Sequence, residues 1–161
     1  MTTMTTKTET TSKPKLPPNP FIHEILDLAS KQKSKAKKVE ILKEYENDAL
    51  KSIFIWNFDE TIISMIPEGQ VPYKENEVPV GTDHTSLRRE YKHLYNFVKG
   101  GNDSLTSLRR ETMFIQILEG LHPEEAKVLC LVKDKNLQSK YKITYDVVKE
   151  AFPDIQWGGR S

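Results

Sequence analysis

Hydrophobic residues recur at intervals of three and four along most of the chain, which is the spacing of an amphipathic helix. The first such run follows Asn19 and Pro20. Asn favours a helix cap and Pro fits the first helical position, so a helix is predicted to begin there. A second run begins at Ser34, a residue that can cap a helix. Its single apolar stripe contains Val39, Leu42, Tyr45, Ala49 and Ile53.

The second run ends in an apolar cluster at positions 53–58. Periodicity alone does not decide whether this cluster is the tail of the helix or a short strand. Residues 59–66 fit a short helix, which Pro67 would end because proline cannot continue a helix. Further prolines and glycines keep the chain extended as far as residue 83.

Four more helices are predicted in the second half of the chain, over residues 85–99, 106–119, 123–134 and 144–152. Each has a recognisable boundary signal, such as the capping Thr144. The connections between them are short, so neighbouring helices should pack antiparallel. The pattern therefore predicts an all-α fold, a small domain of about five to seven helices.

Composition divides the chain into unequal parts. Residues 1–18 are rich in Thr and Pro, with seven Thr in the first eleven positions, and such a composition predicts a disordered leader. A single helical domain is expected over 19–156, followed by a short tail at 157–161. With 161 residues and 37% hydrophobic residues, the chain has enough apolar surface for one core.

Charge and motif content exclude several classes of protein. The net charge is +1, so the chain is no polycation, and it has no run of about 20 apolar residues that could cross a membrane. A single cysteine allows no intrachain disulfide. Asp59 and Glu60 could begin the metal site of a hydrolase, but a lone acidic pair is usually a helix cap. We therefore expect a non-enzymatic protein with no metal and no cofactor.

One motif stands out from this background. The hexapeptide Thr-Ser-Leu-Arg-Arg-Glu occurs at 85–90 and again at 106–111, and the two copies hold four of the five arginines. Both copies open a predicted helix, where each cation opposes the helix dipole at a cost of about 0.3–1 kcal/mol. Arginine is the residue of planar, bidentate recognition of phosphate. The residues predicted to bind an external polyanion are Arg88, Arg89, Arg109 and Arg110.

The alternative is that the arginines are neutralised within the chain, by Glu90, Glu111 or the acidic segment. A lysine run at 31–38 is a second candidate for phosphate contacts, through Lys35, Lys37 and Lys38. Residues 59–83 carry six acids and one lysine, a net charge of −5. This acidic, Pro-rich loop could instead bind a protein partner, together with aromatic residues expected to be exposed, namely Trp56, Tyr73 and Trp157.

Several blocks of the chain resemble a known family. They are ETMFIQILEGLHPEEA at 111–126, LVKDK at 131–135, VKEAFP at 148–153 and PEGQVPYK at 67–74. Over roughly residues 20–156 the chain is similar to a family of small uncharacterised proteins from T-even-like tailed phages of marine bacteria, of the cyanophage type. The resemblance implies the cytoplasm of a phage-infected host as the location. It implies no activity and no site residues.

Two functional hypotheses follow. In the first, the chain is a phage accessory protein that binds DNA, RNA or a nucleoprotein machine through the arginine pairs, helped by the lysines. In the second, it is an adaptor that acts on a phage or host protein through the acidic loop. The arginine pairs distinguish the two, because only the first hypothesis needs them free of internal partners.

Overall fold

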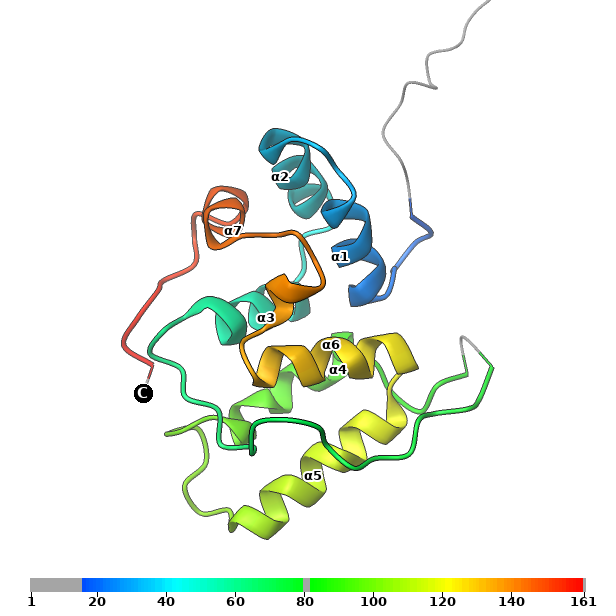
Figure 1. Ribbon diagram of the computed structural model, residues 1–161, viewed down its shortest axis with the longest axis vertical. Helices are drawn as coiled ribbons and strands as arrows, with labels where there is room; N and C mark the ends of the chain where they lie inside the picture. The colour runs from blue at the N-terminus through cyan, green and yellow to red at the C-terminus, as the bar shows by residue number, and fades with distance from the viewer. Residues whose placement is uncertain (1–15, 80–81, 161) are drawn as a thin grey trace, which may run out of the picture.

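The computed structural model describes residues 16–79 and 82–160, and these residues are helical, with no strand. They contain seven α-helices and two 3-10 helices (Figure 1). The α-helices are α1 (Ile22–Ser30), α2 (Lys35–Glu44), α3 (Asp48–Phe58), α4 (Leu87–Glu90), α5 (Ser107–Gly120), α6 (Pro123–Lys133) and α7 (Tyr145–Ala151). The 3-10 helices are η2 (Tyr91–Phe97) and η3 (Leu137–Ser139). The all-α prediction is confirmed.

The helices form one core, with α3 and α6 packed together at its centre. In Figure 1, α2 and α7 lie at the top of the view and α5 lies at the bottom. Pairs of buried aromatic rings occur on both sides of the centre. Phe54 contacts Phe152 on the side of α7, and Phe97 contacts Phe114 edge to face at 5.1 Å on the side of α5. The two ends of the molecule are thereby fixed to the same centre.

The run predicted as one helix from Ser34 to the cluster at 53–58 is two helices, α2 and α3. Ser34 caps α2 as predicted, and the cluster at 53–58 is the end of α3. The break falls before Asn47, whose Oδ1 accepts the backbone N–H of Leu50 at 2.8 Å and caps α3. An Asn side chain that satisfies the first N–H groups of a helix starts a new helix at little cost.

Three other predicted boundaries are wrong. The helix predicted from Asn19 begins at Ile22, and Asn19 has a φ of 52°. Residues 59–66 are not a helix but a turn at 60–61 followed by extended chain, because the Asp59 carboxylate accepts the Thr61 N–H at 2.8 Å and turns the chain away from the axis of α3. The helix predicted over 85–99 shortens to α4 followed by η2.

The acidic segment is held against α5 and α6 (Figure 1). The buried ammonium of Lys133 donates to the carbonyls of Pro67 at 3.0 Å and Gly69 at 2.7 Å. Farther along, the Lys74 N–H donates to the Glu119 carboxylate at 2.8 Å. These bonds satisfy backbone groups of a long segment whose described residues form no helix or strand. The acidic loop is therefore fixed on the surface where it is described.

Candidate nucleic-acid interface

The first turn of α2 is basic and contains no acid. Lys35 and Lys37 are exposed there, and Lys33 is exposed just before the helix. The side-chain ammonium groups of Lys33 and Lys37 have no hydrogen bond or ion pair with any residue of 16–79 or 82–160. Lys35 lies 3.4 Å from Glu150 of α7, and both side chains are more than half exposed. An ion pair so exposed to water contributes little, so Lys35 remains accessible to a ligand.

Lys38 has a different environment from its neighbours. Its ammonium donates to the carbonyl of Ser30, at the end of α1, and to the carbonyl of Lys142 at 2.5 Å. Burial, together with the charge of Lys142, lowers the pKa of Lys38. Lys38 thus joins α1 to the segment before α7, and it supports the surface instead of being one of its free cations.

Two of the four predicted arginines form hydrogen bonds within the molecule. Arg110 is 5% exposed, and it donates to the carbonyls of Asn96 at 2.9 Å, Asn102 at 3.0 Å and Leu105 at 3.3 Å. Arg88 donates through Nε to the carbonyl of Pro20 at 3.0 Å. The expectation that both pairs stay free for an external ligand is wrong for these two. Their partners are backbone carbonyls and not the carboxylates that the alternative proposed.

Arg89 and Arg109 are exposed, and their side chains have no hydrogen bond or ion pair within the described part of the chain. Arg109 lines a cavity of about 630 Å³ between η2 and α5. Glu90 in that cavity is already bonded, because it accepts from Thr85 at 2.6 Å and contacts His93 at 3.3 Å. Each copy of the hexapeptide therefore contributes one free guanidinium.

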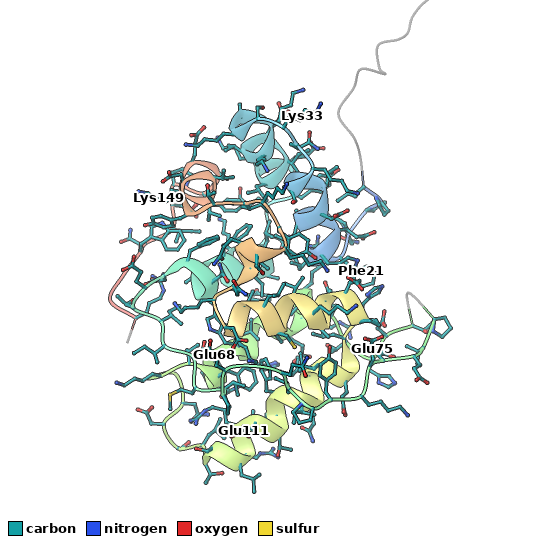
Figure 2. The ribbon with its side chains drawn as sticks, in the orientation of Figure 1. Phe21, Lys33, Glu68, Glu75, Glu111 and Lys149 are labelled. Carbon is teal, nitrogen blue, oxygen red and sulfur yellow. The ribbon has the colours of Figure 1, made fainter. Side chains whose placement is uncertain are left out.

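The predicted arginines and lysines do not form one surface. In Figure 2, Lys33 lies at the top of the molecule and Glu111, the residue after Arg110, lies at the bottom. Lys149 on α7 lies at the same end as Lys33, and α7 packs on α2. The structure thus gathers lysines from two elements at one end, which we call the lysine end (residues 31–38 with Lys142 and Lys149).

A buried carboxylate explains why the first copy of the hexapeptide sits where it does. Glu125 of α6 is 0% exposed, and it accepts the Ile22 N–H and the Leu87 N–H, at 2.9 Å and 3.0 Å. These are the first residues of α1 and α4, so one side chain caps two helices. Burial raises the pKa of Glu125, and the two N–H donors oppose that shift only in part.

The aromatic residues predicted to bind a protein partner are buried or half-buried and contact other residues of the chain. Trp56 is 3% exposed and donates through its indole N–H to Ser64 Oγ at 2.8 Å, so the expectation of an exposed ring is wrong. Tyr73 is half-buried, and burial beside Cys130 raises its pKa to about 12. Trp157 is half-buried and packs edge to face on Tyr145 at 5.0 Å. These rings hold segments onto the core.

Sequence reasoning included Lys33 in the lysine run at 31–38 without singling it out, and it missed Lys142 as a member of the basic surface. Lys142 is held at this surface by long-range bonds, its N–H donating to Ser30 Oγ at 2.9 Å across 112 positions of the chain and its carbonyl accepting from Lys38. No local pattern indicates such a contact.

Comparison with known proteins identifies the family of the chain but no relative of known function or structure. Residues 25–139 match a family of unknown function, DUF6433. The chain belongs to this family. No curated protein and no solved structure matches it. Membership in DUF6433 agrees with the resemblance to an uncharacterised family, and it gives no phage origin.

The described residues contain neither a metal-binding cluster nor a membrane-spanning helix. Residues 16–79 and 82–160 contain no group of three or more His, Cys, Asp or Glu side chains that could hold a metal ion. Over the same ranges, no helix has the length and apolar character needed to cross a membrane. Asp59, the residue considered for a metal site, instead binds the Arg160 guanidinium at 2.6 Å.

Proposed function

We propose that this DUF6433 protein is a non-enzymatic accessory protein that binds a nucleic acid through its lysine end. The observation that carries the proposal is the first turn of α2, where Lys35 and Lys37 oppose the helix dipole and the turn itself contains no acid. Lys37 has no acidic partner among the described residues, and Lys35 has only the exposed ion pair with Glu150. Exposed cations held in this unfavourable position fit an external polyanion. The resemblance to phage proteins suggests a nucleoprotein machine in an infected bacterium as the setting.

The binding surface in this proposal differs from the one that the sequence suggested. Arg88 and Arg110 are engaged with backbone carbonyls, so the arginine pairs do not act as two clamps. Lys33, Lys35 and Lys37 provide the contacts, and Lys38 holds them on α1 and the segment before α7. Because the net charge of the chain is only +1, we expect modest affinity that depends strongly on salt.

The test is a fluorescence-anisotropy titration of the full chain with labelled single- and double-stranded DNA at 50 mM salt. The variant Lys33→Glu/Lys35→Glu/Lys37→Glu should bind at least about tenfold more weakly. Its salt slope should fall by about 2.7, because each lost phosphate contact removes about 0.9. No binding of the wild-type chain at 50 mM salt would refute the proposal.

A matched control separates a specific surface from bulk charge. Lys74, Lys92 and Lys99 are exposed and lie outside α1, α2 and α7. The variant Lys74→Glu/Lys92→Glu/Lys99→Glu has the same net charge as the first variant. It should keep most of the wild-type affinity, and equal losses in the two variants would contradict a site at the lysine end.

A further inference from the structure

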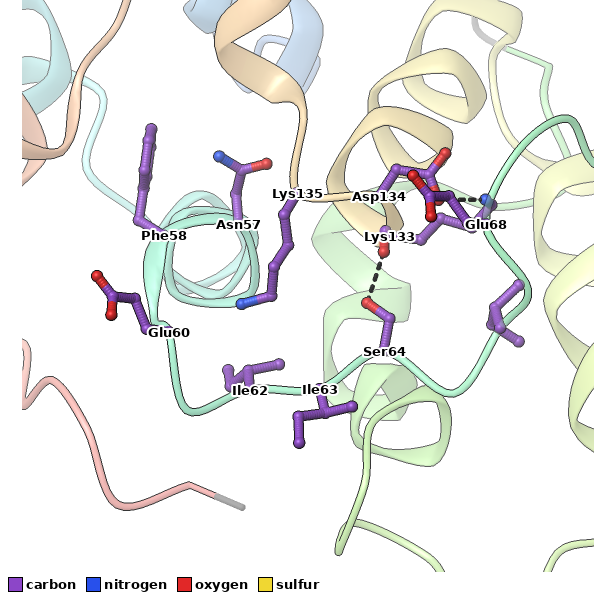
Figure 3. A pocket seen from close by; sticks show the side chains of 11 residues that line it. Asn57, Phe58, Glu60, Ile62, Ile63, Ser64, Glu68, Lys133, Asp134 and Lys135 are labelled. Atoms are coloured by element: carbon purple, nitrogen blue, oxygen red, sulfur yellow. Dashed lines mark hydrogen bonds and ion pairs between the residues drawn. The ribbon is translucent and has the colours of Figure 1, made fainter.

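A groove lies along the first part of the acidic segment, whose charge is opposite to that of the lysine end. Its cavity measures about 580 Å³ (Figure 3). One wall is the segment from Glu60 to Glu68, which is extended on both sides of Ser64, and the others are the last turn of α3 and the turn at Lys133–Lys135. The groove is distinct from the lysine end, and the proposed function makes no use of it.

The extended segment in this groove has one paired edge and one free edge. Ser64 forms an antiparallel bridge with Val98, flanked by the bonds Met65 N–H to Phe97 O at 2.7 Å and Lys99 N–H to Ile63 O at 2.8 Å. Successive residues of an extended chain direct their backbone groups to opposite edges. The N–H and C=O of Ser64 therefore face away from Val98, and neither has a partner among the described residues.

The side chains around the free edge are arranged like those of an unpaired edge strand. Ile62 and Ile66 are buried. Ser64 Oγ donates to the Lys133 carbonyl (Figure 3). On the opposite face, Ile63 and Met65 are 45% and 41% exposed. A strand added at the free edge would pair with Ser64 and cover part of these two apolar side chains.

The negative charge around the groove favours a strand with basic side chains. Glu60 and Glu68 are exposed, and Figure 3 places them at opposite ends of the groove. The C-terminal ends of α3 and α6, which carry the negative pole of each helix dipole, also open here. The two lysines of the groove are already engaged, Lys133 with Pro67, Gly69 and Asp134, and Lys135 with the Asp59 carbonyl.

We propose that this groove binds an extended, basic peptide segment of a partner protein, which adds as a strand to residues 62–66. Backbone hydrogen bonds to Ser64 give the pairing. A cationic side chain near each end of the peptide meets Glu60 or Glu68, and small or apolar residues between them face Ile63 and Met65. A polyanion would be repelled by the same carboxylates, so this surface and the lysine end take ligands of opposite charge.

The test uses the full chain and a fluorescein-labelled nonapeptide with arginine at both ends and alternating valine and threonine between them. We expect saturable binding below about 1 mM by fluorescence anisotropy. The same peptide with glutamate ends should bind at least about tenfold more weakly. A version with proline at its centre should lose binding as well, because proline lacks the N–H that pairing needs. Equal binding of all three peptides would overturn the proposal.

A matched pair of variants locates the site. Glu60→Lys/Glu68→Lys should weaken binding of the arginine-ended peptide at least about tenfold. Glu75→Lys/Glu77→Lys changes two exposed acids of the same acidic segment outside the groove, and should leave binding unchanged. Equal effects of the two double variants would contradict the site.

Hydrogen exchange tests the pairing directly. The Ser64 amide should exchange at least about tenfold more slowly when the chain is saturated with the arginine-ended peptide, because strand addition gives that N–H a partner. An unchanged Ser64 exchange rate in the saturated complex would exclude strand addition. Absence of any peptide binding at 1 mM would also refute the proposal.

Discussion

The two copies of the hexapeptide have the same six residues and different structures. In the second copy, Thr106 is the N-cap of α5, and its hydroxyl accepts the Arg109 N–H at 3.1 Å. In the first copy, the N-cap of α4 is Ser86, one position later in the motif, and Thr85 instead donates to Glu90. The helix start has moved by one residue between identical sequences.

The shift reverses which side chains are buried. Leu87 is 0% exposed, and the equivalent Leu108 is 77% exposed. Arg110 is buried, whereas the equivalent Arg89 is exposed. The difference comes from outside the motif, because Glu125 accepts the Leu87 N–H, whereas no carboxylate of the described residues accepts the Leu108 N–H. Tertiary contacts, and not the local sequence, decide what each copy does.

The largest expected effect is at the leucines. Leu87→Ala should lower the free energy of unfolding by about 3 kcal/mol, because it removes a fully buried side chain and leaves a cavity. Leu108→Ala should change it by less than about 0.5 kcal/mol. Urea unfolding followed by circular dichroism measures both, and equal losses in the two variants would remove the contrast between the copies.

The second effect is at the arginines. Arg110→Ala should cost about 2–3 kcal/mol, because three carbonyls lose a charged donor in a buried place. Arg89→Ala should cost less than about 0.5 kcal/mol. Arg110→Lys should not restore stability, since one ammonium cannot reproduce the spread of the guanidinium donors. Recovery of full stability by lysine in thermal melts would show that charge alone matters at this position.

The third effect tests the residue held responsible for the shift. Glu125→Gln should cost about 1–2 kcal/mol, because an amide has one acceptor oxygen for the N–H groups of Ile22 and Leu87. Glu124→Gln is the matched control, as the Glu124 carboxylate pairs with the exposed Lys127 and Lys140. It should cost less than about 0.5 kcal/mol. Chemical denaturation distinguishes the two. If Glu125→Gln left the free energy of unfolding unchanged, Glu125 would not explain why the helix start differs between the two copies.

The smallest effect is at the caps. Thr106→Ala should cost about 1 kcal/mol and speed hydrogen exchange at the Arg109 amide, because α5 loses its N-cap acceptor. In Thr85→Ala, exchange at the Leu87 amide should stay slow, since Glu125 still accepts that N–H. Fast exchange at Leu87 in Thr85→Ala would mean that Thr85 also caps its helix.

Much of the fold follows from local signals. Ser34 and Thr144 cap helices as predicted, accepting the N–H groups of Lys37 and Val147. The break between α2 and α3 was missed because the apolar stripe continues across it, so periodicity gave no sign of Asn47 as a cap. The β-branched run from Thr61 to Ile63 favours extended chain, and the prediction of a helix over 59–66 did not take it into account.

The candidate interface was predictable only in part. Exposure of Lys35 and Lys37 follows from their place in a charged run. The internal roles of Arg88 and Arg110 could not be foreseen, because their acceptors are backbone carbonyls, and a sequence does not show where carbonyls are left without partners. Lys38 is hidden from sequence reasoning for the same reason.

The carboxylate of Glu125 has a consequence for how the chain reaches its native state. It accepts hydrogen bonds from backbone N–H groups 103 and 38 positions upstream, so neither contact can form before α6 has formed and packed against both segments. Such distant closures slow folding. The amides of Ile22 and Leu87 should therefore become protected late and at the same moment in a pulse-labelled refolding reaction.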